Sequence, residues 1–211
     1  MAISGYQFPP LTQFPSWWHS IHMNVYPIGP FVNGPIVVTR ARHQDLRGSF
    51  EMAFEFEKIR AQVPTLPQFQ QVNILQGVKG SIRGFHWSES GANHWKIVTV
   101  VAGAVRDVVL DMREDSESLG AARYVDLDQG TQVSIVIPPG FAHGMQTLSA
   151  NSSTIYATSV SYYKNKENSI SPIESGFKDI WIEPMILSER DSKSESFEGP
   201  TSISKFELKE S

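Results

Sequence analysis

The sequence predicts an all-β protein, a β-sandwich or barrel, from two features of its central region. Short segments rich in Val, Ile and Thr follow one another between turn residues, which is the spacing of strands in such folds. Within these segments the side chains alternate between two faces, as they do along a strand. One segment would place Val133, Ile135 and Ile137 on one face, and Ser134 and Val136 on the other.

The expected strands fall into five segments, and each is bounded by residues that favour turns. Gly-Pro precedes the first, and two prolines and a glycine end the fourth; proline interrupts strands and glycine permits tight reversals. The segments are residues 34–42, 70–78, 96–113, 132–140 and 153–163. Residues 52–62 have a weak helical pattern. Many short strands and almost no helix indicate a sandwich or barrel.

The third segment is long enough for two strands. It splits after Ala102, at a glycine, as the two strands of a hairpin would. In its second half Val108 and Leu110 would share one face, and Asp107 and Asp111 would share the other. We therefore expect two strands that present acidic side chains on one side of a sheet.

The two ends of the chain differ in composition from the centre. Residues 1–35 hold six of the thirteen prolines and several aromatic residues, so we expect an arm that lies over another surface rather than a helix or sheet. Residues 192–211 are rich in Ser, Glu and Lys, which predicts a polar tail that is mobile past about residue 195. The β-rich domain would then span residues 36–191.

Composition limits the class of protein. The 211 residues include no cysteine, which excludes disulfides and thiolate chemistry and fits a cytoplasmic protein. A net charge of −4 argues against nucleic acid as a partner. We expect no membrane association, since the sequence has no apolar run of about 20 residues and no signal peptide at its start.

Two motifs raise the question of a metal site. Gly80 and His86 have the spacing G-x5-H, and Pro138, Gly140 and His143 have the spacing P-x-G-x2-H. Together they resemble the metal-binding motifs of cupin barrels, in which a second histidine follows the first at two residues. Here Ser88 stands at that position, and serine is a poor ligand for a transition metal. We therefore expect a cupin-type β-barrel or jelly roll with no metal and no other cofactor.

A histidine in such a barrel can act as a general base, because its neutral form is available at pH 7. It then needs a carboxylate to hold its tautomer, and the candidates are Asp107, Asp111 and Asp191. Arg47 and Arg83 each precede a glycine, and with Lys96 they could bind a diphosphate. Regular alternation would put Arg83 and His86 on opposite faces, so a bulge or turn at Gly84 is needed to bring them together.

The motifs RGFH, GAVRDVVLDMR, IPPGFAHG and SYY, in this order and with Lys96 ten residues after the histidine, resemble the dTDP-4-dehydrorhamnose 3,5-epimerase family. The resemblance extends from about residue 36 to 191. It implies a metal-free cupin barrel that acts on dTDP-4-keto-6-deoxyhexoses. It also implies a homodimer, because Phe50 matches an aromatic residue that reaches the neighbouring subunit's site.

The resemblance also implies roles for individual residues. His86 matches the catalytic base that removes the proton beside the ketone, Asp191 its carboxylate partner, and Lys96 the lysine near the C4 oxygen. His143 matches a histidine close to the sugar. The remaining matches are substrate contacts: Arg47 and Arg83 to phosphate and sugar, Gln71 and Asn73 to the nucleotide, and Tyr162 to thymine by stacking.

The proton-donating tyrosine depends on register. Counting forward from His143 places the family's acid on Tyr156, whereas counting back from Tyr162 places it on Ala157. A slip of one residue turns a side chain to the opposite face, so Tyr156 serves only if it points inward. Departures such as Ser88, where the family has glutamine, favour an altered substrate or epimerisation at C3 or C5 alone.

Three other functions remain open from the sequence. A sugar-nucleotide 3,4-ketoisomerase would use a similar barrel and would relocate the carbonyl. A non-catalytic sugar-nucleotide-binding barrel would keep the arginines and the stacking tyrosine but lose the acid. A metal-dependent cupin enzyme would need a third ligand, which His94 or Glu89 would have to supply.

Overall fold

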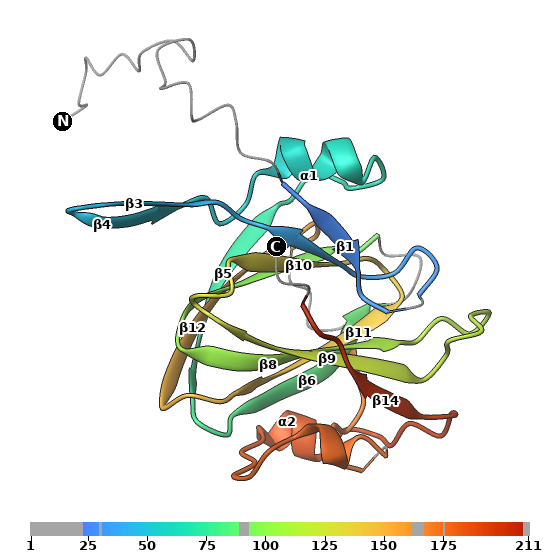
Figure 1. Cartoon of the computed structure of the whole chain (residues 1–211). Coiled ribbons are helices and arrows are strands. Elements are labelled where there is room, and N and C mark those ends of the chain that lie inside the picture. Colours follow the sequence, from blue (N-terminus) through green and yellow to red (C-terminus); the bar gives the residue numbers. More distant parts are fainter. Residues whose placement is uncertain (1–22, 30, 89–92, 162–166, 175, 209–211) are drawn as a thin grey trace, which may run out of the picture.

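The computed structural model describes residues 23–29, 31–88, 93–161, 167–174 and 176–208. It confirms the all-β prediction: the described strands form two six-stranded sheets and one separate two-stranded hairpin. The sheets face one another as a jelly-roll sandwich (Figure 1). Such packing buries the side chains of both inner faces, and these inner faces also provide the walls of the site.

The first sheet has the strand order β1-β2-β10-β7-β12-β5, with every described pair antiparallel. β2, β5, β7 and β10 fall within the predicted segments, and β12 begins two residues before its segment, whereas β1 was not predicted. Their bounds are β1 (Val25–Pro27), β2 (Ile36–Thr39), β5 (Gln71–Val78), β7 (Lys96–Ala102), β10 (Val133–Ile137) and β12 (Asn151–Thr158).

The second sheet has the order β13-β6-β11-β8-β9-β14. Its described pairs are antiparallel apart from β14, which runs parallel to β9. The bounds are β6 (Ile82–Ser88), β8 (Ala104–Asp111), β9 (Ala121–Asp128), β11 (Phe141–Thr147), β13 (Glu167–Ser169) and β14 (Ser202–Lys205). Of these, only β8 lies in a segment that the sequence predicted as strand.

The predicted hairpin after Ala102 is wrong, although both of its strands exist. β7 pairs with β10 and β12, whereas β8 pairs with β9 and β11 in the opposite sheet. The chain crosses between sheets at Gly103, whose φ of 72° requires glycine or strain. Alternation within each strand cannot reveal this crossing, because it does not say which strand is the neighbour.

The core lies between the sheets and is continued by apolar layers outside them. Val133, Ile135 and Ile137 are buried in the central cluster while Val136 faces outward, which confirms the predicted alternation. Helix α1 (Phe56–Gln62) covers the outer face of the first sheet, with Ile59 in the same outer cluster as Val136.

The outer face of the second sheet is covered by the segment that contains the 3-10 helix η5 (Lys178–Ile180) and helix α2 (Glu189–Ser192) (Figure 1). Its core packs Phe177 and Trp181 against Phe85 of β6, with ring centroids 5.4 and 5.6 Å from Phe85. No described helix is both long and apolar enough to cross a bilayer. The covered sheet is a rigid platform for the side chains on its inner face.

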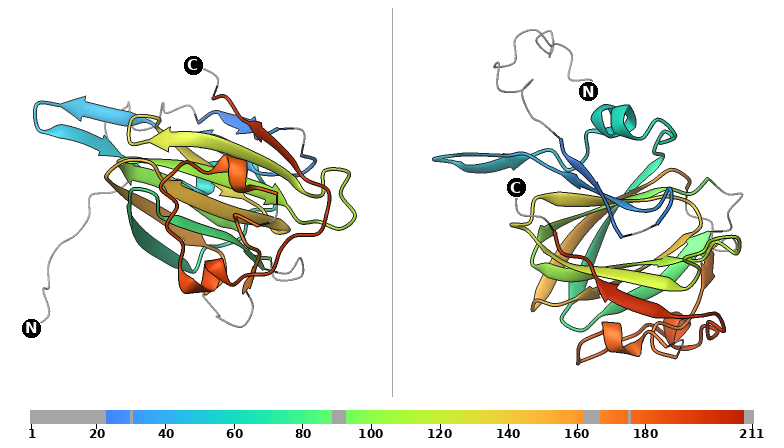
Figure 2. Two further views of the ribbon diagram at one scale, coloured as in Figure 1. Left: turned by 90° about the horizontal axis from the view of Figure 1, so that it is seen from below. Right: turned by 45° about the vertical axis from the view of Figure 1, so that its right-hand side comes forward.

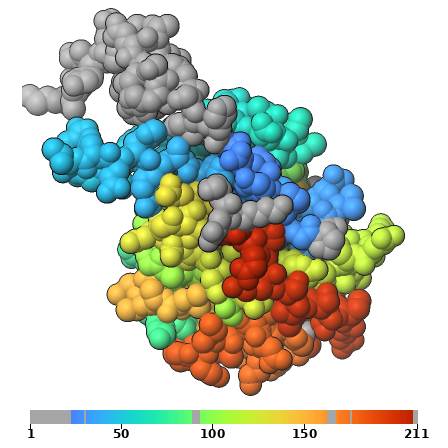
Figure 3. Space-filling model, in the orientation of Figure 1, coloured from blue at the N-terminus to red at the C-terminus, as the bar shows by residue number. Residues whose placement is uncertain are grey.

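A hairpin of β3 (Arg42–Asp45) and β4 (Gly48–Glu51) extends away from both sheets, as all views show (Figures 1, 2 and 3). Its base is held by Arg40, which lies 2.7 Å from Glu51, and by a second ion pair to the same carboxylate. Leu46 in its turn is fully exposed, and Phe50 on β4 is half exposed. An exposed apolar tip on a projecting hairpin is typical of a surface that contacts another chain.

The domain boundaries expected at residues 35 and 192 do not match the sheets. β1 lies inside the predicted arm and pairs with β2, where Pro27 is tolerated because β1 is an edge strand. β14 lies inside the predicted tail and pairs with β9, and Phe206 and Leu208 beyond it pack on the central core. Polar composition misled the prediction, since a few apolar residues were enough to anchor the segment. Residues 1–22 of the predicted arm lie outside the described residues.

Candidate active site

A cavity of about 720 Å³ lies between the inner faces of the two sheets. It gathers most of the residues that the sequence singled out, from strands far apart in the chain. Those lining it are Gln71, Asn73, Arg83, His86, Lys96, His143, Tyr156 and Asp191. The cavity volume falls within the range usual for small-molecule sites.

His86 and Asp191 form a tight pair in this cavity. His86 Nε2 lies 2.6 Å from Asp191 Oδ1, and the Asp191 side chain is almost fully buried. Asp191 is held in place by the start of α2, where its backbone N–H donates to Ser188 Oγ at 3.1 Å. Burial alone would raise the pKa of Asp191, but the hydrogen bond from His86, together with Ser188 and the charge of Arg190, holds it below its ordinary value. The carboxylate is therefore ionised at neutral pH.

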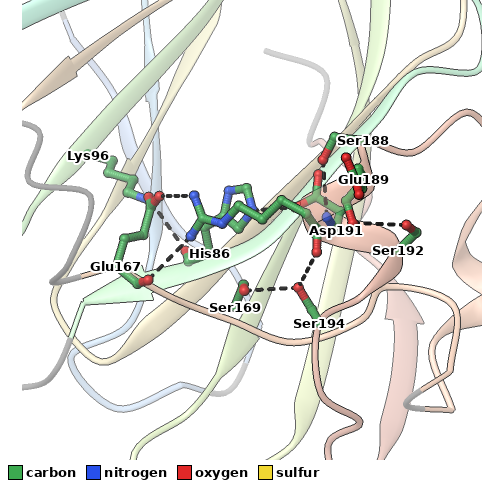
Figure 4. Close-up of polar contacts among 10 residues, drawn as sticks. His86, Lys96, Glu167, Ser169, Ser188, Glu189, Asp191, Ser192 and Ser194 are labelled. Carbon is green, nitrogen blue, oxygen red and sulfur yellow. Dashed lines mark hydrogen bonds and ion pairs between the residues drawn. The ribbon is translucent and has the colours of Figure 1, made fainter.

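The pair determines which nitrogen of His86 can accept a proton. An ionised carboxylate can only accept hydrogen bonds, so the proton of neutral His86 resides on Nε2 and the lone pair resides on Nδ1. Figure 4 shows the ring held between Asp191 on one side and Lys96 with Glu167 on the other. This is the arrangement of an oriented general base.

Lys96 lies on β7 with its side chain buried. Its ammonium donates to the backbone oxygen of His86 at 3.3 Å and lies 3.8 Å from Glu167 Oε1. Arg190 Nη1 approaches the other oxygen of Glu167 at 3.1 Å (Figure 4). Burial lowers the pKa of Lys96, and Glu167 partly offsets this effect. When protonated, Lys96 is a desolvated cation in the cavity that can stabilise negative charge on a bound molecule.

A second histidine–carboxylate pair stands across the strand from the first. His143 of β11 is the cross-strand partner of His86, and its Nε2 lies 2.8 Å from Asp107 Oδ2. Asp107 is almost fully buried. Two of the three candidate carboxylates thus hold histidines, whereas Asp111 binds Arg113 away from the cavity.

β6 contains the bulge that Arg83 and His86 need in order to face the same cavity. On β11, His143 is opposite His86 and Met145 is opposite Arg83, so that two residues of β6 stand against one of β11. Gly84 in the bulge has a φ of 123°, a region that favours glycine. The extra residue turns Arg83 and His86 to the same cavity.

Tyr156 points inward. β12 pairs with β5 in continuous register from Asn151 to Thr158, and Tyr156 lines the cavity while Ala157 is buried on the other face. The bulge in this part of the sheet lies on the neighbouring strand β7, where Val101 has no partner on β12. The structure therefore selects the count made forward from His143.

Among the described residues, two that were expected at the site are not among its walls. Arg47 and Phe50 lie on the projecting β3–β4 hairpin, where the Arg47 side chain is 90% exposed and pairs with Asp45. Tyr162 lies outside the described residues. In the part of the chain that the structure describes, no cluster of three or more His, Asp or Glu residues is arranged to hold a metal ion.

Sequence reasoning missed Glu167 and Arg190, and considered His94 only as a metal ligand. All three line the cavity. Glu167 lies in a polar stretch with no strand pattern, and it reaches the site because β13 pairs with the edge of β6. Arg190 directly precedes Asp191, so its place in the motif SERD was the available signal.

Comparison with known proteins agrees with this geometry. The family model for dTDP-4-dehydrorhamnose 3,5-epimerase matches residues 31–199. The enzyme of that name from Mycobacterium tuberculosis is 32% identical over 173 residues, which cover 79% of this chain and 85% of the relative. A dTDP-4-dehydro-6-deoxyglucose 3-epimerase from a Streptomyces species is 28% identical over 71% of this chain and 77% of its own.

Solved structures show the same likeness. A 4-keto-6-deoxy sugar epimerase from the novobiocin biosynthetic gene cluster of Streptomyces spheroides superposes with a TM-score of 0.78 and 26% identity, over 83% of this chain and 88% of its own. A dTDP-6-deoxy-D-glucose-3,5-epimerase from Legionella pneumophila, in complex with dTDP-4-keto-L-rhamnose, gives 0.76 and 29%, over 83% and 93%. The family model covers most of the chain and the relatives match it along most of their own length, so the chain belongs to the dTDP-4-dehydrorhamnose 3,5-epimerase family of isomerases.

Proposed function

We propose that the protein epimerises a dTDP-4-keto-6-deoxyhexose at C3, at C5 or at both carbons. His86 removes the proton next to the C4 ketone through Nδ1, and Asp191 stabilises the imidazolium that forms. Lys96 holds the enolate oxygen, and Tyr156 returns a proton from the opposite face. His86 stands on the second sheet and Tyr156 on the first, with the cavity between them, which supports approach to a sugar from two sides.

The remaining polar residues suit the nucleotide and the rest of the sugar. We propose that Arg83 and the projecting Arg47 contact phosphate or sugar, because a guanidinium matches phosphate oxygens in pairs. Gln71 and Asn73, which lie on the inner face of β5 and contact one another at 2.6 Å, would bind the nucleotide. His143, held by Asp107, would contact the sugar, and Tyr162 would stack on thymine.

The observation that carries this proposal is the 2.6 Å contact of His86 with Asp191 in the cavity that also holds Lys96. It is tested by incubating the protein with dTDP-4-keto-6-deoxyglucose in D2O and measuring deuterium at C3 and C5 by mass spectrometry and NMR. We expect exchange in the wild type and loss of exchange in His86→Asn, with dTDP binding retained. A product in which the carbonyl has moved would support a 3,4-ketoisomerase, and dTDP binding without exchange would support a binding protein.

We further propose a homodimer in which Arg47 and Phe50 complete the site of the second subunit. The hairpin tip projects from its own sheets, and the outer face of β5 exposes Val72 and Ile74 by 59% and 74%, an apolar surface that a second copy would cover. Mixing an Arg47→Ala/Phe50→Ala double variant with His86→Asn tests this. If the hairpin acts in trans, subunit exchange restores about one site in four; if it acts in cis, mixing restores none.

A further inference from the structure

A serine–histidine pair borders the catalytic lysine and has no part in the proposed reaction. Ser88, at the end of β6, places its Oγ 2.6 Å from Nδ1 of His94. His94 lines the same cavity as Lys96 and precedes it by two residues, just before β7 begins. The other ring nitrogen of His94, Nε2, is buried and has no hydrogen-bond partner among the described residues.

Burial and the nearby charge of Lys96 decide the state of this ring. They lower the pKa of His94 to about 4, so the ring is neutral at pH 7 and carries one N–H. An N–H on Nε2 would be a buried, unsatisfied donor near the positive charge of Lys96. A proton on Nδ1 instead donates to Ser88 Oγ and leaves a lone pair on Nε2, which a neighbouring cation favours. The second tautomer is therefore the more stable.

We propose that Ser88 and His94 form a positioning pair for Lys96, in which the Nε2 lone pair of the neutral imidazole stabilises the ammonium and keeps it charged in the cavity. Lys96 needs such a partner because a buried ammonium has three N–H groups, and each requires an acceptor. One donates to the backbone oxygen of His86, and Glu167 is beyond hydrogen-bond length at 3.8 Å. No hydrogen bond joins Lys96 to His94 among the described contacts, so in this proposal the Nε2 lone pair acts on the ammonium as the negative end of the ring dipole, without direct contact. The inference rests on the proposed role of Lys96 at the enolate oxygen.

The charge on Lys96 is a balance to which several elements contribute. Glu167 of β13 and Asp107 of β8 raise its pKa, whereas burial and Arg190 of α2 lower it. The other titratable or charged groups that line the cavity around it are Arg83, His86, His143, Tyr156 and Asp191. Replacing His94 with an apolar ring of similar size leaves all of these in place, so it should lower the pKa of Lys96 further.

The direct test is an NMR titration of the Lys96 side-chain nitrogen in protein labelled with ¹⁵N-lysine, with the signal assigned by its loss in Lys96→Met. We expect a pKa lower than the wild-type value by about 0.5 to 1 unit in His94→Phe, and little change in His94→Gln, whose amide oxygen supplies an acceptor. If His94→Phe does not fold, as judged by thermal unfolding, Ser88→Ala replaces it and should give a smaller shift in the same direction. An unchanged Lys96 titration in the folded variant overturns the inference.

The pH profile of deuterium exchange supplies a second readout that a purely structural role would not move. In His94→Phe we expect the alkaline limb of kcat to move to lower pH by the same amount, with KM within about twofold and rescue by His94→Gln. If the wild type exchanges deuterium and the alkaline limb of His94→Phe does not move, the positioning pair is refuted and the proposed function is left intact. A wild type that exchanges no deuterium refutes the proposed function, and the NMR titration then decides the inference about His94 without it.

Discussion

Replacing Asp191 with asparagine isolates the electrostatic part of the His86–Asp191 pair. The substitution keeps the shape of a side chain that is almost fully buried, so the packing of α2 is preserved. It removes the negative charge that stabilises imidazolium. The amide can also donate to Nε2, which would move the ring proton to Nδ1 and block the proposed base.

The expected magnitude follows from the contact. A hydrogen bond to a charged group is worth about 1.5–3 kcal/mol, and a short, buried contact of 2.6 Å lies at the strong end of that range. We therefore expect deuterium exchange to be slower by about 100-fold in Asp191→Asn. Glu189→Gln is the matched control, because Glu189 lies on the same helix, is exposed and pairs only with Lys193 among the described contacts.

The assay measures initial rates of deuterium uptake by dTDP-4-keto-6-deoxyglucose in D2O, with dTDP affinity determined by calorimetry. Both variants should bind dTDP as the wild type does, and Glu189→Gln should exchange at the wild-type rate. An Asp191→Asn exchange rate within threefold of wild type would show that the carboxylate does not assist His86, and the reasoning about the tautomer would then be wrong.

Three further predictions concern the cation, the bulge and a structural carboxylate. Lys96→Met should slow exchange by about 100- to 1000-fold, the cost of losing one preorganised group at a developing oxyanion; a rate near wild type would contradict this. Gly84→Ala should lower the melting temperature by at least about 4 °C more than Gly48→Ala. Both glycines have a φ near 125°, but a Cβ on residue 84 would stand 2.6 Å from the backbone of β11, whereas a Cβ on residue 48 would meet nothing within 4 Å. Equal losses of melting temperature would mean that the close approach to β11 is harmless. Burial alone would raise the pKa of Asp111, but hydrogen bonds from Arg113 and two serines hold it below its ordinary value of 3.8. The ionised Asp111 therefore stabilises the folded state above pH 3.8, and this contribution to the free energy of unfolding is lost as the pH falls through the lower pKa of the folded state. Urea unfolding of Asp111→Asn should show a loss of about 3 kcal/mol at pH 7 that shrinks in acid, and a loss independent of pH would refute the assignment.

Local pattern predicted the strands that are rich in Val, Ile and Thr, and it failed for those of mixed or polar composition. β10 was identified because four of its five residues are Val or Ile. β13 and β14 were missed because their residues are polar, and they pair only because the edges of β6 and β9 are available to them. Edge pairing is a property of the sheet rather than of the segment that joins it.

By itself, the sequence determined the fold class and the family and named the candidates for proton transfer, since motif spacing carries this information directly. The family resemblance had already paired Asp191 with His86, and the tertiary structure places the two in contact and assigns Asp107 to His143. It also turned Tyr156 inward and brought Glu167 to Lys96. The physical reason is that each of these depends on strand register, on a bulge or on an edge contact between segments distant in the chain, and a one-residue change in any of them reverses the direction of a side chain.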